Sequence, residues 1–249
     1  MQILIANDDG YLSPGIRSLQ AGLSQISTAI IVAPDRNRSG ASNSLTLSRP
    51  VLVKPHGELV YSVEGTPTDC VNIALSGLLD TDPDMVVSGI NDGPNMGDDV
   101  LYSGTVAAAV ESRFLGHPAI AVSMGSHRPQ HYDAAAAVVV QLIERMQKSP
   151  LPADTILNVN VPDLAFDQIK GLRATRLGTR HHSTNAILAN SPRDETAYWI
   201  GPAGEINDDG IGTDFAAIRD QFVSITPLQI DMTRHDSMTS LASWLEQPA

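Results

Sequence analysis

Apolar residues follow two alternating patterns along the first part of the chain. Short apolar runs typical of buried strands lie at residues 2–6, 28–33, 85–88, 119–123 and 156–161. Between them, apolar residues recur every three or four positions, which predicts helices that begin near residues 13, 66, 103 and 133. Strands that alternate with helices are typical of a parallel sheet covered on both faces. We therefore predict a Rossmann-like, three-layer α/β/α fold with a mostly parallel sheet.

Polar and turn-forming residues interrupt this pattern. Val51–His56 and Leu59–Val63 alternate apolar and polar residues around a short turn, which predicts a β-hairpin. The segments 35–44 and 89–103 are rich in polar residues and glycine, and we predict them to be loops. Beyond about residue 163 the pattern loosens. There the sequence predicts strand-like alternation at 172–177, an acidic turn at 207–210, a strand at 222–226 and a last helix at 237–245.

Composition narrows the class of protein. Hydrophobic residues make up 42% and charged residues 18%, which excludes wholesale disorder. Acidic residues outnumber basic ones by 28 to 16, so the net charge of -12 argues against a nucleic-acid duplex or an anionic membrane as partner. The single cysteine, Cys70, excludes an internal disulfide and a thiolate metal cage. We find neither an apolar run of membrane-spanning length nor a leader pattern, and we expect a cytoplasmic protein.

Three polar segments follow predicted strands of the sheet. They are Asn7–Gly10, Arg36–Gly40 and Gly89–Gly97. The carboxyl ends of parallel strands meet at one edge of a sheet, where ligands bind. We therefore expect these three segments to form one site.

The first of these segments suggests a metal ion. Asp8 and Asp9 are adjacent carboxylates with no basic residue beside them, so a divalent cation would relieve their repulsion. Ser39 and Asn91 would add neutral oxygens, and such hard ligands favour Mg²⁺ or Mn²⁺ over Zn²⁺. The alternative is that Asn-Asp-Asp-Gly is an ordinary turn.

The predicted helix start at Ser103 suggests an anion site. Ser103-Gly104-Thr105 brings two hydroxyls and backbone N–H groups to a helix N-terminus, where a phosphate is favoured. The alternative is an ordinary serine cap. The nearby glycines match neither the dinucleotide fingerprint nor a Walker A loop.

Other polar residues are weaker candidates. Arg36 and Arg38, beside Ser39, are within possible reach of a phosphate. We interpret the remaining residues as structural or solvated: Cys70 as an inert core residue, His117 and His235 as structural, and His181, His182, Asp208 and Asp209 as solvated.

Several ordered motifs are spread along the chain: Asn7–Gly10, Ala33–Gly40, Gly65–Val71, Ser88–Asn91 through Tyr102–Thr105, Asn158–Pro162, Gly212–Asp214 and Ser224–Leu228. Together they resemble the SurE (survival protein E) nucleotidases across essentially the whole chain. One departure is visible: Asp220-Gln221 stands where the family commonly has a glycine, which leaves the conformation of that turn open.

The resemblance implies a metal-dependent phosphatase that acts on nucleoside 5'- and 3'-monophosphates, with some action on short polyphosphate. It implies one divalent cation, Mg²⁺ or Mn²⁺, held by Asp8, Asp9, Ser39 and Asn91, and a phosphate site at Asn95 and Ser103 to Thr105. It also implies a homodimer or homotetramer formed by exchange of C-terminal arms. The arm corresponds to about 172–201, in one domain over 1–249 with its core at about 1–170 and exchanged elements beyond.

The residues suggest a mechanism and two rivals. We expect a water near the metal to attack phosphorus, with Asp9 orienting or deprotonating it and Asp8 acting mainly as a ligand. Asn95 and the Ser103–Thr105 segment would stabilise the phosphate oxygens. One rival is a phosphatase with an aspartyl-phosphate intermediate, which would want Asp-x-Asp-x-Thr at a strand end. The other is a nucleotide-sensing module without turnover.

Overall fold

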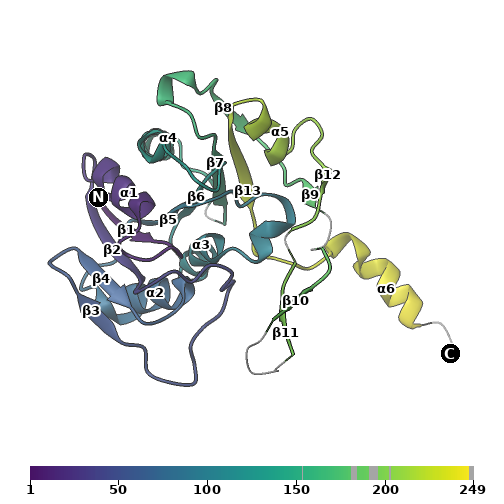
Figure 1. Ribbon diagram of the computed structural model, residues 1–249, viewed down its shortest axis with the longest axis horizontal. Helices are drawn as coiled ribbons and strands as arrows, with labels where there is room; N and C mark the ends of the chain where they lie inside the picture. The colour runs from purple at the N-terminus through teal and green to yellow at the C-terminus, as the bar shows by residue number, and fades with distance from the viewer. Residues whose placement is uncertain (153, 181–183, 191–195, 202, 247–249) are drawn as a thin grey trace.

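The computed structural model describes residues 1–152, 154–180, 184–190, 196–201 and 203–246, and a nine-stranded sheet runs through its centre (Figure 1). In spatial order its strands are β3 (Val53–Pro55), β4 (Val60–Val63), β2 (Thr28–Pro34), β1 (Gln2–Ala6), β5 (Met85–Asn91), β6 (Ala119–Met124), β7 (Ile156–Val161), β13 (Val223–Leu228) and β8 (Leu172–Ala174). The strands from β4 to β7 are parallel, whereas β3 and β13 run antiparallel to their neighbours β4 and β7. The predicted strands, hairpin and mostly parallel sheet are confirmed.

Helices cover both faces of this sheet. On one face α1 (Pro14–Leu23) packs against α4 (Tyr132–Lys148), and on the other α2 (Pro67–Ile73) packs against α3 (Gly104–Phe114). Residues 74–78 continue α2 as a wider π-helical turn. Alternate residues of β1 point to opposite faces of the sheet. Ile3 and Ile5 pack in the core under α1 and α4, whereas Leu4 and Ala6 pack in the core under α2. The three-layer α/β/α architecture is therefore confirmed.

Three of the four predicted helix starts are N-caps, whereas α4 begins after His131 without a side-chain cap. The Ser103 hydroxyl accepts a hydrogen bond from the Val106 N–H at 3.1 Å. At α2, Thr66 and Asp69 form a capping box, and Pro67 occupies the first turn. The Ser13 hydroxyl caps α1 by accepting a hydrogen bond from the Ile16 N–H. These caps fix where α1, α2 and α3 begin, next to the carboxyl ends of the strands that precede them.

The prediction of one loop from 89 to 103 is wrong. Strand β5 continues to Asn91, and residues 97–101 form a 3-10 helix. Gly89 lies within the strand. A side chain is excluded there because a β-carbon would overlap the carbonyl oxygen of Val122 on neighbouring β6. This glycine marks a close approach of two strands and not the end of one.

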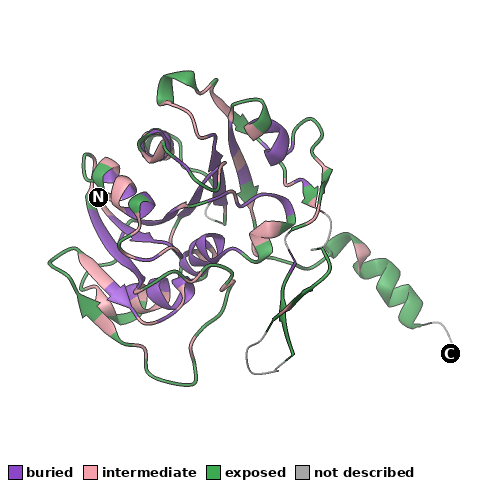
Figure 2. Ribbon diagram, viewed as in Figure 1, coloured by how far each residue is buried: buried purple, intermediate pink, exposed green. Residues whose placement is uncertain are grey.

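The last part of the chain contributes to the sheet and also extends away from it. Short pairs link β9 (Thr179–Arg180) with β12 (Ile206–Asp208), and β10 (Ile187–Ala189) with β11 (Ala197–Trp199). The predicted terminal helix is present as α6 (Met238–Leu245), and Figure 2 shows it exposed along its length. Sequence analysis missed α5 (Asp214–Arg219), and the predicted strand at 172–177 is limited to β8. Short 3-10 turns lie at 166–168 and 235–237.

The turn after α5 places a non-glycine residue in the left-handed region. Gln221 has φ +69°, its N–H donates to the Ile218 carbonyl, and the Phe222 N–H donates to the Ala217 carbonyl. This is the hydrogen-bond pattern of a helix end that favours glycine. The departure noted in the sequence therefore falls on the position where glycine has a physical advantage.

Replacing this glutamine by glycine is expected to stabilise the protein. Gln221→Gly removes a left-handed penalty of roughly 1–2 kcal/mol but adds backbone entropy to the unfolded chain, which costs about 0.4–1 kcal/mol. We expect the free energy of unfolding to rise by about 0.5–1 kcal/mol, measured by urea denaturation. Gln221→Ala, which keeps a β-carbon, is the matched control. Equal stability of the two variants would show that the left-handed conformation carries no penalty.

Candidate functional site

The three polar segments predicted to form a site do meet. Strand β1 lies between β2 and β5, and the chain leaves β1 toward β2 on one side and later reaches β5 on the other. Such a switch in strand order opens a crevice at the carboxyl ends of the strands. The Arg38 N–H donates to the Asp8 carbonyl at 2.7 Å, and the Asp92 N–H donates to Asp9 Oδ2 at 3.0 Å. The loops after β2 and β5 thus both close on the Asp8–Asp9 pair.

Asp8 lies against the start of α3. Its side chain is buried, and the Thr105 hydroxyl donates to Asp8 Oδ1 at 2.6 Å. A β-carbon on Gly104 would lie 2.8 Å from the β-carbon of Asp8, so only glycine lets the helix start approach this closely. Burial raises the pKa of Asp8, and the hydrogen bond from Thr105 opposes that rise.

The Asp9 carboxylate is perturbed as well. Burial, and then the neighbouring charge of Asp8, raise the pKa of Asp9 to about 6. Asn37 donates to Asp9 Oδ1 at 3.1 Å. Within the part of the chain that the structure describes, no Lys, Arg or His forms an ion pair with Asp8 or Asp9. The two carboxylates therefore lack a compensating positive charge.

Ser39 and Asn91 are the neutral oxygen donors predicted for a cation. Ser39 is exposed on the loop that Asn37 ties to Asp9, and Asn91 ends β5 one residue before Asp92. The Asn91 side-chain nitrogen donates to the Gly93 carbonyl at 2.8 Å, so its carbonyl oxygen is the atom left to hold a cation. Among the described residues no three His, Cys, Asp or Glu side chains gather to hold a metal ion. A metal here must use Ser and Asn oxygens, and the residues present fit a hard dication.

The residues predicted to bind phosphate divide into two groups. Ser103, Gly104 and Thr105 lie at the start of α3 beside Asp8, but the Ser103 hydroxyl caps the helix and the Thr105 hydroxyl bonds Asp8. The backbone N–H groups of this turn are thus the better anion donors. Asn95 is buried elsewhere: its side chain donates to the Ser123 hydroxyl at 2.7 Å, and its backbone is held by Asn158 and Asn160. These contacts tie Asn95 to β6 and β7, and its role stays a prediction.

A family model described as "Survival protein SurE" matches residues 3–184. The chain belongs to the SurE family. The resemblance drawn from the ordered motifs is confirmed by this match.

Full-length relatives agree with it. A protein named 5'-nucleotidase SurE from Methylococcus capsulatus is 56% identical over 98% of both chains. Its namesake from Halorhodospira halophila is 56% identical over 99% of this chain and 98% of the relative. The crystal structure of a SurE protein from Aquifex aeolicus superposes with a TM-score of 0.88 at 40% identity, covering 99% of this chain and all of the other. The fold of this SurE chain is thus supported by both sequence and structure.

Sequence reasoning missed three residues of this SurE site. Asn37 and Asp92 bond Asp9, and the Tyr132 hydroxyl donates to the Asp92 carboxylate. Asn37 and Asp92 lie within the polar segments already singled out, so their position was a usable signal. Tyr132 begins α4, 40 residues beyond Asp92, and nothing in the local pattern points to it.

The weaker candidates have mostly structural surroundings. Arg38 pairs with Asp35 at 3.3 Å, which leaves its reach to a phosphate untested. Cys70 is fully buried, and burial raises the pKa of its thiol, as expected of an inert residue. His117 Nδ1 lies 3.0 Å from the Pro83 carbonyl oxygen. His181 and His182 lie outside the described residues.

The acidic segment at 207–210 differs from its predicted form. Asp208 ends the short strand β12, and it pairs with Arg176, whereas Asp209 pairs with Arg219. Asp208 is half-buried and Asp209 is exposed, and both are paired with arginines, unlike Asp8 and Asp9.

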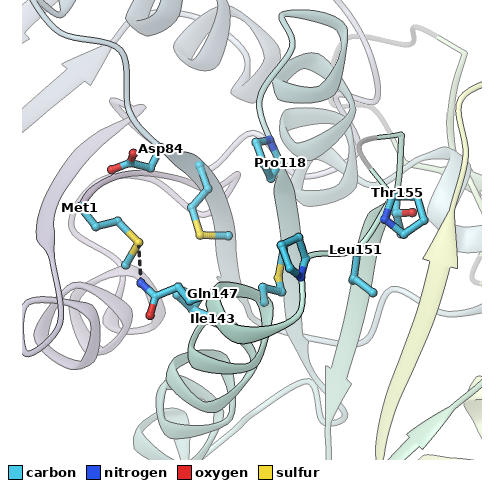
Figure 3. A pocket seen from close by; sticks show the side chains of 11 residues that line it. Met1, Asp84, Pro118, Ile143, Gln147, Leu151 and Thr155 are labelled. Atoms are coloured by element: carbon cyan, nitrogen blue, oxygen red, sulfur yellow. Dashed lines mark hydrogen bonds between the residues drawn. The ribbon is translucent and has the colours of Figure 1, made fainter.

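A pocket of this SurE chain lies at the opposite edge of the sheet, among the described residues. It has a volume of about 470 Å³ and is lined mainly by apolar side chains from the amino ends of β1, β5, β6 and β7 and the end of α4 (Figure 3). Gln147 donates to the sulfur of Met1 across it. Because ligands of parallel sheets bind at the carboxyl ends, this pocket is not the candidate site.

No helix among the described residues is long and apolar enough to cross a membrane.

Proposed function

We propose that this chain is a metal-dependent nucleotidase that converts nucleoside 5'- and 3'-monophosphates to nucleoside and phosphate, with some action on short polyphosphate. The observation that carries the proposal is the Asp8–Asp9 pair, in which Asp8 is buried and Asp9 is half-buried. This pair lacks a basic partner among the described residues and lies against the N-terminus of α3. A cation on these carboxylates and a phosphate on the helix start would compensate each other. Relatives named 5'-nucleotidase that are 56% identical support the substrate class.

The chain's own residues divide the work of hydrolysis. Asp8, Asp9, Ser39 and Asn91 would hold Mg²⁺ or Mn²⁺, and when bound this cation polarises the phosphate and makes a nearby water more acidic. Asp9 is proposed to orient the attacking water and accept its proton. The backbone N–H groups at the start of α3 are proposed to stabilise phosphate oxygens as charge develops on them, and the N–H of Gly104 also faces the Asp8 carboxylate. Asn95 is included in this role as a prediction.

Two observations argue against the rival mechanism with an aspartyl-phosphate intermediate. An aspartyl-phosphate enzyme would want Asp-x-Asp-x-Thr, and this chain has Asp8-Asp9-Gly10-Tyr11 after β1. The Thr105 hydroxyl donates to Asp8 Oδ1, which lowers the nucleophilicity of that oxygen. We therefore favour direct attack by water, and beryllium fluoride, which traps a phosphoaspartate mimic, separates the two mechanisms.

A phosphate-release assay tests the proposal as a whole. The full chain is incubated with AMP, GMP and their 3' isomers, with Mn²⁺, after EDTA treatment, and after return of Mn²⁺. We expect release with Mn²⁺, its loss with EDTA and its recovery when metal returns. No release under any condition would favour the nucleotide-sensing module. Release that resists EDTA would contradict metal dependence.

We also propose that the chain forms a homodimer or homotetramer through its C-terminal arm, in the cytoplasm. The support is a set of apolar side chains left exposed there: Ile187, Leu188, Tyr198, Trp199 and Ile200 on the β10–β11 arm and Leu241, Trp244 and Leu245 on α6 (Figure 2). Apolar groups gathered on projecting elements are typical of protein interfaces. Light scattering during size-exclusion chromatography measures the mass, and a 26.5 kDa monomer would contradict the proposal.

A further inference from the structure

We infer that Asp92 strengthens cation binding at the Asp8–Asp9 site without holding the cation itself, and that Tyr132 is the positioning residue that keeps Asp92 there. This inference rests on the proposed metal-dependent function and extends it to two residues outside the predicted ligand set. Two hydrogen bonds carry it, one from Tyr132 to Asp92 and one from Asp92 to Asp9.

These contacts link α4 to the site through Asp92. The Tyr132 hydroxyl donates to Asp92 Oδ1, and the Asp92 N–H donates to Asp9 Oδ2 at 3.0 Å. Asn37 holds the other oxygen of Asp9 at 3.1 Å, so both oxygens of this carboxylate are oriented by neighbours. A contact that holds Asp92 in place therefore also holds Asp9 in place.

The ring of Tyr132 is itself fixed by close packing. A β-carbon on Gly15 would lie 3.3 Å from Tyr132 Cε1 and would overlap the Ile90 carbonyl oxygen. Helix α1, the end of β5 and the start of α4 thus meet with no room for an added methyl group. The hydroxyl reaches Asp92 from a rigid support, as positioning residues require.

The Asp92 carboxylate lies near the site without an ion-pair partner among the described residues. Its carboxylate accepts a hydrogen bond from a neutral hydroxyl and forms no ion pair with any described Lys, Arg or His. Burial and the bond to Asp92 raise the pKa of Tyr132, which keeps this hydroxyl a donor. The charge of Asp92 acts on both Asp8 and Asp9, yet the three carboxylates do not gather around one point as ligands would. A dication at Asp8–Asp9 is thus attracted by a third, more distant carboxylate.

The test measures Mn²⁺ binding to the substrate-free full chain by titration calorimetry. Asp92→Asn removes the charge but keeps the backbone N–H and the shape, and we expect Kd to rise about five- to ten-fold. This is the low end for outer partners of a metal ligand because Asp92 is exposed. Tyr132→Phe keeps the ring and the charge, and we expect Kd to rise about three-fold. The matched control is Asp133→Asn, which removes an exposed charge one residue from Tyr132 and is expected to leave Kd within about two-fold.

The double variant Asp92→Asn/Tyr132→Phe decides whether Tyr132 acts through Asp92. Its Kd should equal that of Asp92→Asn alone, because the tyrosine then has no charge to position. Multiplied effects would overturn the positioning role. An unchanged Kd in Asp92→Asn overturns the inference, and a higher KM for AMP with unchanged Mn²⁺ affinity would assign Asp92 to the substrate instead. A wild-type chain that binds Mn²⁺ but releases no phosphate would overturn the proposed function and leave this inference standing.

Discussion

Replacing Asp8 by asparagine is expected to lower kcat/KM for nucleoside monophosphates on the order of a thousand-fold or more while the fold stays intact. The substitution removes the buried one of the two carboxylates proposed to hold the cation. Asparagine has nearly the same shape, and its side-chain oxygen still accepts the hydrogen bond from Thr105. The loss should therefore be chemical and not structural. Steady-state kinetics with AMP at several Mn²⁺ concentrations measures it.

Asp84→Asn is the matched control for this experiment. Asp84 lines the pocket at the opposite edge of the sheet, so the same chemical change there should leave kcat/KM close to that of the wild-type chain. Circular dichroism and a melting curve establish that both variants fold. Near-normal hydrolysis by Asp8→Asn would remove the metal site from the proposed mechanism, whatever the control shows.

Much of the fold follows from periodicity alone because the sheet is buried on both faces. β1 and β2 are continuous apolar runs with one or no exposed residue, and α4 carries an apolar stripe, so these elements are visible in the sequence. The antiparallel place of β13 between β7 and β8 depends on pairing between distant segments, which no local pattern encodes. α5 has only six residues, too few for a periodic signal.

The site shows a similar division. Asp8, Asp9 and Asn91 were predictable because polar residues at the ends of apolar strands are local features of the sequence. The bond from Thr105 to Asp8 and the contacts of Asn95 with Ser123 and Asn160 join segments 28 to 97 residues apart. Such contacts depend on how the helices and strands pack, so sequence reasoning found the residue types but not their partners.

Among the described residues no basic side chain pairs with Asp9. In the metal-free protein the Asp9 carboxylate should therefore lower the free energy of unfolding. The pKa of Asp9 is about 6 when folded and near 3.8 when unfolded, so between these values the folded state binds more protons than the unfolded state. Stability contributed by this group is therefore lost as pH rises from about 4 to 6 and stays lost above 6. The raised pKa of Asp8 acts in the same direction. The penalty from Asp9 at pH 7.5 is on the order of 3 kcal/mol, or about 6–12 °C in Tm.

Asp9→Asn should accordingly raise the Tm of the EDTA-treated protein at pH 7.5 while it removes activity, although the gain is reduced by the loss of one of the two hydrogen bonds that Asp9 accepts from Asn37 and Asp92. At pH 4.5 the wild-type Asp9 is largely protonated, so the advantage of the variant should shrink there. Added Mn²⁺ should reverse the order at pH 7.5, because it binds the folded wild-type chain and stabilises it by mass action but gains little from the variant. Melting curves across this pH range, with EDTA and with Mn²⁺, test each sign, and the exposed Asp133→Asn serves as control. If the Tm of the wild type and that of Asp9→Asn change in parallel with pH, Asp9 titrates normally. The site would then need no cation to compensate the charge of Asp9.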